Sequence, residues 1–326
     1  MSSPVIVNPE ADEFVRLRVG RKEQVARDTF LFELRDPAGG ELAGFTPGSH
    51  VTVEVPSGSR RNYSICSDPA QRAFYEIAVK RDPNGRGGSV SMADEVHAGS
   101  LLPVSPPRNN FEMSERARRF VFIAGGIGIT PILSMMRHLK RSGDRPFTLY
   151  YLTRDAQGSA FLEHLQQEFG EQFAVHHDNG DREQAFDLWP VLERPGPAAH
   201  VYCCGPRALM DSVQGMTGHW GSGTVHFESF GAGPAAHAEN RPFKVELHRS
   251  QRIVEVGANE SILEALRRSA VHVASSCESG TCGSCRTALL GGEAEHRDAV
   301  LGEHEQASEI MVCVSRARSA VLVLDL

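Results

Sequence analysis

The sequence predicts a multidomain protein with three parts: an antiparallel β-barrel, an α/β domain on a doubly wound parallel sheet, and a small C-terminal β domain. Alternating polar and apolar segments fill the first third of the 326 residues, and apolar strands alternate with amphipathic helices in the middle third. Four of the seven cysteines fall in the last third. We place the domains at 1–112, 113–230 and 241–326, joined by a linker of small and polar residues at 231–240.

Composition excludes several functional classes. The net charge is −7 and the chain has no basic stripe, which argues against a nucleic-acid or membrane-surface partner. No apolar run approaches the roughly 18 residues of a membrane span, and the N-terminus lacks the basic and apolar regions of a signal peptide. The odd number of cysteines favours a reducing compartment. We therefore expect a cytoplasmic protein.

Two motifs interrupt the alternating pattern of the barrel. Arg61, Tyr63 and Ser64 lie close together along a strand. They offer, respectively, a guanidinium group that can bind a phosphate through two N–H groups, an aromatic ring face and a hydroxyl. Gly85, Gly87 and Gly88 lead into Ser89 and a predicted helix start, whose amides form a natural phosphate cradle. Taken singly, a strand with a cross-strand aromatic and an ordinary turn explain them as well. The strands are predicted at Phe14–Val19, Thr29–Leu34, His50–Val55 and Phe74–Val79.

Two loops of the α/β domain have the pattern of nucleotide-binding turns. The buried strand Arg119–Ala124 runs into a glycine turn and a helix that has Pro131 near its start, which directs amides and the helix dipole at a pyrophosphate. The turn is not G-x-G-x-x-G, so a plain tight turn is an alternative. The strand His200–Cys204 ends in Gly205 and Pro206. Both loops follow parallel strands, and this predicts dinucleotide binding.

The C-terminal cysteines have the C-x4-C-x2-C spacing, with a distant fourth cysteine, of a plant-type 2Fe–2S cluster. A loop supplies three thiolates and a separate strand is expected to bring the fourth, while Gly280 and Gly283 let the loop curl. Zinc is the alternative, although zinc ribbons usually show two C-x2-C pairs. The predicted ligands are Cys277, Cys282, Cys285 and Cys313.

The motifs, in this order, resemble the phthalate dioxygenase reductase family within the ferredoxin–NADP reductase superfamily. The resemblance spans nearly the whole chain and implies a C-terminal β-grasp ferredoxin domain. It also implies electron transfer from NADH through FMN and a 2Fe–2S cluster to the Rieske centre of a ring-hydroxylating dioxygenase, by a monomeric reductase. Alternatives are the reductase of another Rieske oxygenase, such as an O-demethylase, or a ferredoxin-like carrier or sensor without catalysis.

The resemblance also assigns roles to residues. Phe230 is expected to stack on the flavin and to move when the nicotinamide arrives, close to Cys204, Glu228, Ser229 and Ser64. The residues expected to hold FMN are Arg61, Asn62, Tyr63, Ser64, Ala78, Val79, Lys80, Gly87, Gly88, Ser89, Thr130 and Phe230. Those expected to hold NAD are Gly125, Gly126, Gly128, Thr130, Pro131, Thr153, Arg154, Cys204, Gly205 and Pro206.

Three polar stretches complete the sequence reading. Arg154 and Asp155 follow a strand without a basic cluster nearby, which favours NADH over NADPH. His176 and His177 are adjacent on a predicted strand, so their side chains should point to opposite faces and not share a metal. The acidic stretch at 293–305 is expected to be a solvated face, with a partner-docking role as the alternative.

Overall fold

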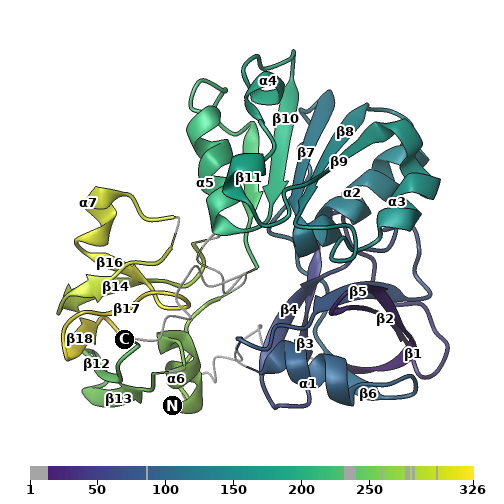
Figure 1. Ribbon diagram of the computed structural model, residues 1–326. Helices are drawn as coiled ribbons and strands as arrows, with labels where there is room; N and C mark the ends of the chain where they lie inside the picture. Colours follow the sequence, from purple (N-terminus) through teal and green to yellow (C-terminus); the bar gives the residue numbers. More distant parts are fainter. Residues whose placement is uncertain are drawn as a thin grey trace, which may run out of the picture.

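The computed structural model describes residues 14–85, 87–230, 240–258, 260–275, 280, 283–298 and 300–326. Its three parts follow one another along the chain (Figure 1), with the barrel at the lower right, the α/β domain above it and the C-terminal domain at the left.

The first domain is a closed antiparallel barrel. Its strand order is β4-β3-β6-β1-β2-β5, and a bridge between Ile65 and Ile77 joins the two outer strands. Helix α1 (Gly88–Glu95) packs Met92 into the barrel core. The predicted barrel is therefore confirmed. The strands are β1 (Val15–Ala26), β2 (Thr29–Arg35), β3 (His50–Glu54), β4 (Arg60–Ser64), β5 (Tyr75–Lys80) and β6 (Leu101–Val104).

The second domain has a parallel five-stranded sheet in the order β11-β10-β7-β8-β9. The chain reverses its direction of winding between β7 and β10, and a crevice for ligands lies at such a switch point in doubly wound sheets. Both predicted nucleotide turns follow these two strands. The elements are β7 (Arg119–Gly125), α2 (Ile129–Ser142), β8 (Phe147–Thr153), α3 (Leu162–Phe169), β9 (Phe173–His177), α4 (Trp189–Leu192), β10 (Ala199–Cys204), α5 (Arg207–Met216) and β11 (Val225–Glu228), with short 3-10 turns at Gly126–Gly128, Gly170–Gln172 and Arg182–Gln184.

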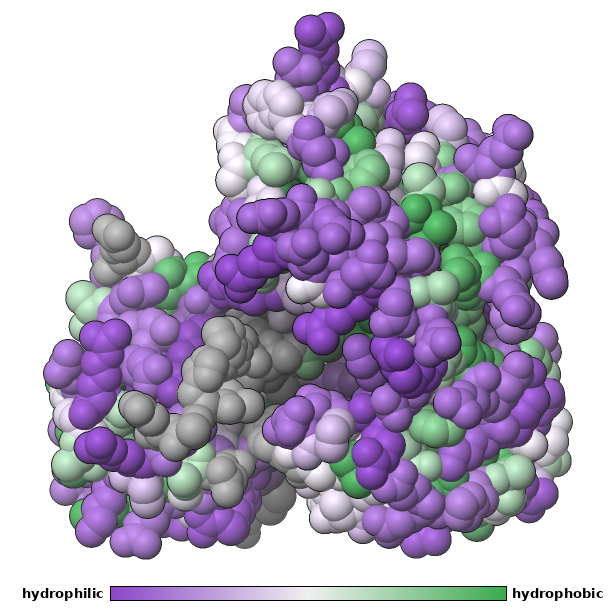
Figure 2. Space-filling model, in the orientation of Figure 1, coloured by the Kyte–Doolittle hydropathy of each residue, from purple (hydrophilic) through white to green (hydrophobic). Residues whose placement is uncertain are grey.

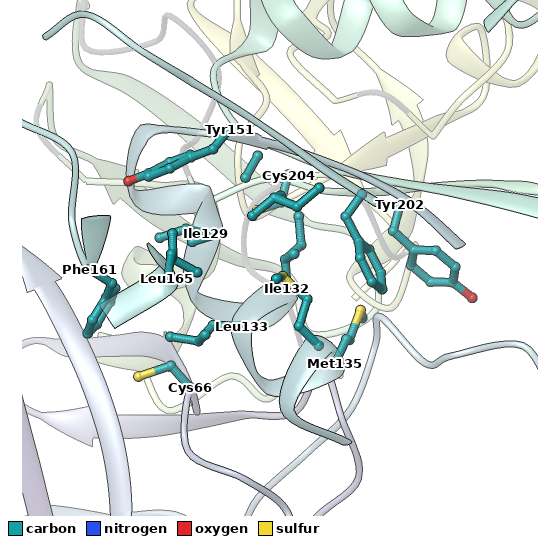
Figure 3. Packing of buried hydrophobic residues seen from close by; sticks show 14 of the residues in the cluster. Cys66, Ile129, Ile132, Leu133, Met135, Tyr151, Phe161, Leu165, Tyr202 and Cys204 are labelled. Atoms are coloured by element: carbon teal, nitrogen blue, oxygen red, sulfur yellow. The ribbon is translucent and has the colours of Figure 1, made fainter. Parts of the chain in front are cut away.

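The barrel and the α/β domain share one hydrophobic core. Cys66 from the barrel lies beside Leu133 of α2 in a cluster that also contains Met135 and continues to Cys204 (Figure 3). Across the same boundary, Arg137 of α2 donates hydrogen bonds of 2.9 Å to the Cys66 carbonyl and 3.1 Å to the Glu76 carboxylate. A continuous core and a half-buried ion pair make these two domains one unit.

The C-terminal domain has a core of its own. Helix α6 (Ile262–Arg268) packs against a mixed sheet in the order β13-β12-β18-β14-β16, in which β12 and β18 are parallel. This is the expected β-grasp arrangement. One detail of the sequence prediction is wrong, because β16 ends at Met311 and Cys313 lies in the turn that follows it. The remaining elements are β12 (Phe243–Leu247), β13 (Arg252–Val256), β14 (Arg286–Gly291), β15 (Ala294–Glu295), α7 (Glu303–Gln306), β16 (Glu309–Met311), β17 (Arg316–Ala317) and β18 (Val321–Leu324).

The molecular surface fits the charged composition. The face seen in Figure 2 is dominated by hydrophilic side chains, with hydrophobic residues exposed in smaller areas. Within the part of the chain that the structure describes, no helix has the length and apolarity needed to cross a lipid bilayer.

A histidine pair lies between β10 and β11. His200 Nδ1 and His226 Nε2 are 3.0 Å apart, and the His226 ring stacks on Tyr202 with 4.3 Å between ring centroids. Burial, with His200 alongside, lowers the pKa of His226 to about 4. Burial also lowers the pKa of His200. The pair is therefore neutral in the folded protein at neutral pH.

This pair predicts that stability depends on pH. In the unfolded chain His226 titrates near 6.5, so between about pH 6.5 and 4 the unfolded state binds a proton that the folded state does not. The melting temperature should therefore fall as the pH drops below about 6.5. His226→Phe should make this slope shallower, whereas His164→Gln, on the exposed side of α3, should leave it unchanged. Calorimetry from pH 8 to 5 measures both slopes, and equal slopes for His226→Phe and the parent protein would contradict the assignment.

Candidate functional site

The two glycine turns of the α/β domain meet backbone to backbone. A Cβ atom on Gly128 would lie 2.1 Å from the carbonyl oxygen of Cys204. A Cβ atom on Gly205 would lie 2.9 Å from Cα of Gly125. Side chains are therefore excluded at both positions, and the turns after β7 and β10 close the sheet edge at the switch point. Pro206 is exposed and precedes the first residue of α5.

The start of α2 presents its backbone amides at this edge. Gly126 has a φ of +54°, a conformation that glycine adopts without strain, and a 3-10 turn leads directly into α2. Thr130 is buried and its hydroxyl donates to the carbonyl of Ile127 at 3.1 Å. Pro131 lies in the first turn, where a missing amide hydrogen costs nothing. The first turn of α2 is thus suited to an anionic ligand.

Cys204 lies at the end of β10 opposite Glu228 of β11. Its side chain is fully buried. Burial raises the pKa of the Cys204 thiol well above its usual range, and the nearby Glu228 and Cys203 raise it further. The thiol is therefore protonated at neutral pH and is not a nucleophile. Its side chain belongs to the hydrophobic core directly behind this edge of the sheet.

Ser64 and Glu228 connect the barrel with the parallel sheet. Ser64 Oγ donates to Glu228 Oε2 at 3.5 Å, although the two residues are 164 positions apart. Ser229 is half-buried beside them, and the Phe230 side chain is 43% exposed. The structure thus brings the Arg-Asn-Tyr-Ser strand to the carboxyl edge of the parallel sheet.

A second cradle lies within the barrel. A Cβ atom on Gly88 would be 2.7 Å from Nε of Arg61, so the guanidinium group lies directly over the first residue of α1. Gly87 before it has a φ of +80°, and no side chain from the described residues caps the helix. The Ser89 hydroxyl accepts a hydrogen bond from the amide of Asp82 at 3.1 Å, which leaves its hydrogen to donate. The predicted phosphate site is thus assembled from both motifs.

Tyr63 provides a direct test for a ligand at this strand. Its hydroxyl is buried and meets no hydrogen-bond partner among the described residues. Burial raises the pKa of the Tyr63 phenol well above its usual range. The phenol is therefore protonated at neutral pH and can donate a hydrogen bond to a ligand atom. Ala78 and Val79 on β5 are buried and Lys80 is exposed. Asn62 accepts a hydrogen bond from Thr52 at 2.7 Å, which holds it within the barrel. The orphaned phenol fits a polar ligand with an acceptor atom at this position.

Two of the four predicted cluster cysteines lie together. Cys285 and Cys313 are buried, and the Cys285 carbonyl accepts from the amide of Val312, the neighbour of Cys313, at 3.4 Å. Gly280 and Gly283 have φ values of +73° and +81°, as the predicted loop curvature requires. Cys277 and Cys282 lie outside the described residues. The two described thiols, which come from turns far apart in the sequence, suit ligands of one cluster.

The residues after β8 have local partners. The Thr153 hydroxyl is 2.7 Å from both Ser159 Oγ and His177 Nδ1. Arg154 is exposed, whereas Asp155 pairs with Arg27 of the barrel at 2.6 Å. The choice of NADH over NADPH therefore stays a prediction. The two adjacent histidine rings have different partners, since His177 Nδ1 lies at the Thr153 hydroxyl and His176 Nε2 lies 2.6 Å from the Gln184 carbonyl oxygen.

The acidic stretch of the C-terminal domain is largely neutralised by arginines. Glu295 pairs with Arg297 at 2.8 Å, and Glu305 pairs with Arg286 at 2.8 Å. The Glu305–Arg286 pair is exposed and contributes little to stability, whereas the Glu295–Arg297 pair is partly buried. Their geometry favours the solvated face over a docking patch.

Sequence reasoning missed Glu264. It lies in the first turn of α6, and its Oε1 is 3.8 Å from Nη1 of Arg61 in the barrel. The available signal was the S-x-x-E capping box formed with Ser261, which marks a helix start but not the contact across the domain boundary.

Comparison with protein families gives three matches in the order of the domains. Residues 16–113 match the oxidoreductase FAD-binding domain, residues 122–215 the oxidoreductase NAD-binding domain and residues 245–318 the 2Fe–2S iron–sulfur cluster binding domain. The expected flavin, nicotinamide and cluster domains are thereby confirmed, although the first match does not distinguish FMN from FAD.

Individual relatives cover almost the whole chain. It is 58% identical over 316 residues to the phthalate 4,5-dioxygenase oxygenase reductase subunit of Pseudomonas putida, covering 97% of this chain and 98% of the relative. A solved structure of phthalate dioxygenase reductase is 57% identical and superposes with a TM-score of 0.89, covering 98% of this chain and all of that one. The vanillate O-demethylase oxidoreductase of Pseudomonas putida is 38% identical over 314 residues, covering 94% and 98% of the two chains.

The contact between the two glycine turns predicts how the addition of a methyl group at Gly128 affects stability and coenzyme binding. Gly128→Ala should force the loops after β7 and β10 apart, because the new Cβ has no room beside the Cys204 carbonyl. We expect a loss of about 1–3 kcal/mol in the free energy of unfolding and weaker binding of NADH. Denaturant unfolding and a coenzyme titration measure the two effects. Gly215→Ala is the control, since open space surrounds that helical glycine, and it should stabilise slightly. Normal coenzyme binding by Gly128→Ala would exclude these turns from the binding site.

Proposed function

The chain belongs to the phthalate dioxygenase reductase family, and on this premise we propose that it passes electrons from NADH through FMN and a 2Fe–2S cluster to the Rieske centre of a ring-hydroxylating dioxygenase. Phthalate dioxygenase is the acceptor that we favour, because the two phthalate dioxygenase reductases compared above are 57–58% identical over nearly the whole chain. Rieske centres have a higher potential than plant-type clusters, so this direction of electron flow is downhill.

One observation carries the proposal. The 3.5 Å contact between Ser64 and Glu228 puts the flavin motif of the barrel at the carboxyl edge of the nucleotide sheet. A nicotinamide bound over the turns at Gly128 and Gly205 would reach that edge, where parallel sheets bind their dinucleotides. Hydride transfer requires such close approach, and the protein supplies position and electrostatics while the cofactors supply the redox chemistry.

The residues at this edge have defined tasks in the proposal. Ser64 and Glu228 form a polar pair that would lie beside the reacting ring atoms, and the small, neutral Cys204 thiol would leave room for the nicotinamide. Ser229 extends the polar edge. Phe230, with nearly half of its surface exposed, would cover the flavin and would move aside for the coenzyme. Thr153 and Arg154 form the adenosine side of the coenzyme site. No general base is needed.

We propose FMN because the cradle at α1 fits a terminal phosphate. Arg61 over Gly88, the amides at the start of α1 and the Ser89 hydroxyl are donors for a phosphate dianion. Tyr63 would donate to the ligand, with Asn62, Ala78, Val79, Lys80 and Thr130 lining the ring and ribityl chain. The Gly-Arg-Gly-Gly-Ser sequence of this chain also resembles the sequence found in the FMN-binding branch of the family.

A second acceptor class is the alternative. The chain is also 38% identical to the vanillate O-demethylase oxidoreductase. In this alternative, the electron acceptor is the oxygenase of an O-demethylase or of a similar monooxygenase. Electron transfer assays with purified oxygenases of both classes distinguish the two. We further propose that the protein is a monomer and that it lies in the cytoplasm, where thiolate ligands are kept reduced. The proposed domain boundaries are 1–112, 113–230 and 241–326.

Rapid mixing with NADH tests the function itself. We expect flavin absorbance to bleach first and cluster absorbance to follow on the timescale of turnover. No bleaching at saturating NADH would favour a carrier or sensor over a reductase.

Removal of one cluster ligand should separate the two halves of the reaction. Cys313→Ala should lose bound iron and the electron paramagnetic resonance signal of the reduced cluster, because three thiolates do not complete the site. NADH should still bleach the flavin at the parent rate, while electron delivery to the oxygenase falls to background. Cys66→Ala, a buried cysteine outside the site, should retain all of these properties apart from stability. Retained iron in Cys313→Ala would exclude Cys313 as a ligand.

The phosphate cradle predicts both the flavin and its affinity. Acid-released cofactor should contain no adenine. Gly88→Ala should push the Arg61 guanidinium away from the helix start and weaken FMN binding about tenfold, roughly 1.4 kcal/mol. Fluorescence titration of flavin-free protein measures this, with Gly85→Ala as the control because its Cβ would meet only ordinary contacts. Extraction of FAD, or equal affinities for the two variants, would contradict the assignment.

A further inference from the structure

The C-terminal ferredoxin domain contacts the barrel through a charged pair. Glu264 Oε1 of α6 and Arg61 Nη1 of β4 are 3.8 Å apart. Both side chains are mostly shielded from water, with 32% and 20% of their surfaces exposed, so the attraction is screened less than at an open surface. In Figure 1, α6 lies on the side of its domain that faces the barrel.

The Glu264 carboxylate is held in place from its own side. Its Oε2 atom accepts hydrogen bonds from the Ser261 amide at 2.8 Å and from the Ser261 hydroxyl at 3.1 Å. The Ser261 hydroxyl in turn accepts from the Glu264 amide at 3.1 Å. This capping box occupies one carboxylate oxygen and leaves the other directed at Arg61.

The two ends of this pair reach the two redox sites. On the barrel side, the Arg61 guanidinium lies over Gly88 at the proposed flavin phosphate cradle. On the ferredoxin side, the amide of Leu263 donates to the carbonyl of Val312 at 2.9 Å, and the amide of Val312 donates to the carbonyl of Cys285 at 3.4 Å. A chain of direct contacts therefore runs from the flavin cradle through α6 to the turn that carries Cys313.

We propose that Glu264 is a positioning residue that docks the ferredoxin domain on the barrel through Arg61 and so sets the rate of electron transfer from flavin to cluster. The inference rests on the proposed function, because it concerns the step between these two groups. In that step one electron leaves the reduced flavin and reduces the oxidised cluster, and a second electron follows after the cluster has been reoxidised by the acceptor. Glu264 touches neither group and acts through domain position alone.

The test uses the full-length holoprotein with Glu264→Gln. A glutamine side-chain oxygen keeps the capping box, so the variant removes the charge and leaves α6 intact. NADH should bleach the flavin at the parent rate, while reduction of the cluster should be about two- to fivefold slower, the range expected for one partly shielded ion pair. Cluster reduction in the parent protein should also slow at about 1 M salt, and Glu264→Gln should have lost this dependence.

Glu260→Gln is the matched control. It makes the same charge change four residues earlier, where the carboxylate pairs with Arg268 of its own domain at 2.8 Å. It should leave both the rate and the salt dependence unchanged. Small-angle scattering gives a readout independent of turnover: Glu264→Gln should have a larger radius of gyration than the parent protein, and Glu260→Gln should not.

The outcomes separate this inference from the function on which it rests. A parent protein that transfers no electrons from flavin to cluster would overturn the proposed function. A parent protein that does so, with Glu264→Gln equal to it in rate, salt dependence and radius of gyration, would overturn the positioning role. Equal slowing in Glu264→Gln and Glu260→Gln would also overturn it, because general loss of acidic charge would then be the cause.

Discussion

The turn at Gly128 lies against the carbonyl group of Cys204 with no space for a side chain between them, and the geometry of the nucleotide edge depends on this contact. It closes the carboxyl edge of the sheet between β7 and β10 and presents the first turn of α2 at that edge. It also holds the end of β10 in register with β11, so that Glu228 reaches Ser64 of the barrel. A backbone contact of this kind cannot relax through a rotamer change, so the edge that the α/β domain contributes to the site keeps a fixed geometry.

The three predicted domains form two mechanical units. The barrel and the α/β domain share a core that passes through Cys66, Leu133 and Cys204, whereas the ferredoxin domain closes its own core around α6. Hydride transfer needs reacting atoms in contact, and it falls within the unit with the continuous core. Electron transfer tolerates separation, and it falls across the boundary where Arg61 and Glu264 meet. The distribution of apolar packing thus matches the spatial demands of the two steps.

Much of the fold and part of the site follow from sequence patterns, for identifiable reasons. The apolar run ending at Ala124 and the glycines after it define a buried strand and a tight turn by composition alone. The curvature at Gly280 and Gly283 follows from cysteine spacing. The sequence predicts a strand at Cys313, where the structure has a turn, because Val312 and Val314 continue an alternating pattern that tertiary contacts override. The contacts of Glu264 with Arg61 and of Ser64 with Glu228 join residues more than 160 positions apart, and such pairs have no local signal.

The self-contained core of the ferredoxin domain has a consequence for how the chain can change. The chain between β11 and β12 joins that domain to the rest, and the core residues on each side form complete clusters without it. Lengthening this connection would therefore alter neither fold. It would lower the effective concentration of the cluster at the flavin, because the effective concentration of a tethered partner falls with roughly the −3/2 power of linker length. Insertions at this single place can therefore change the rate of electron transfer between flavin and cluster, or the position of the whole ferredoxin domain, during evolution.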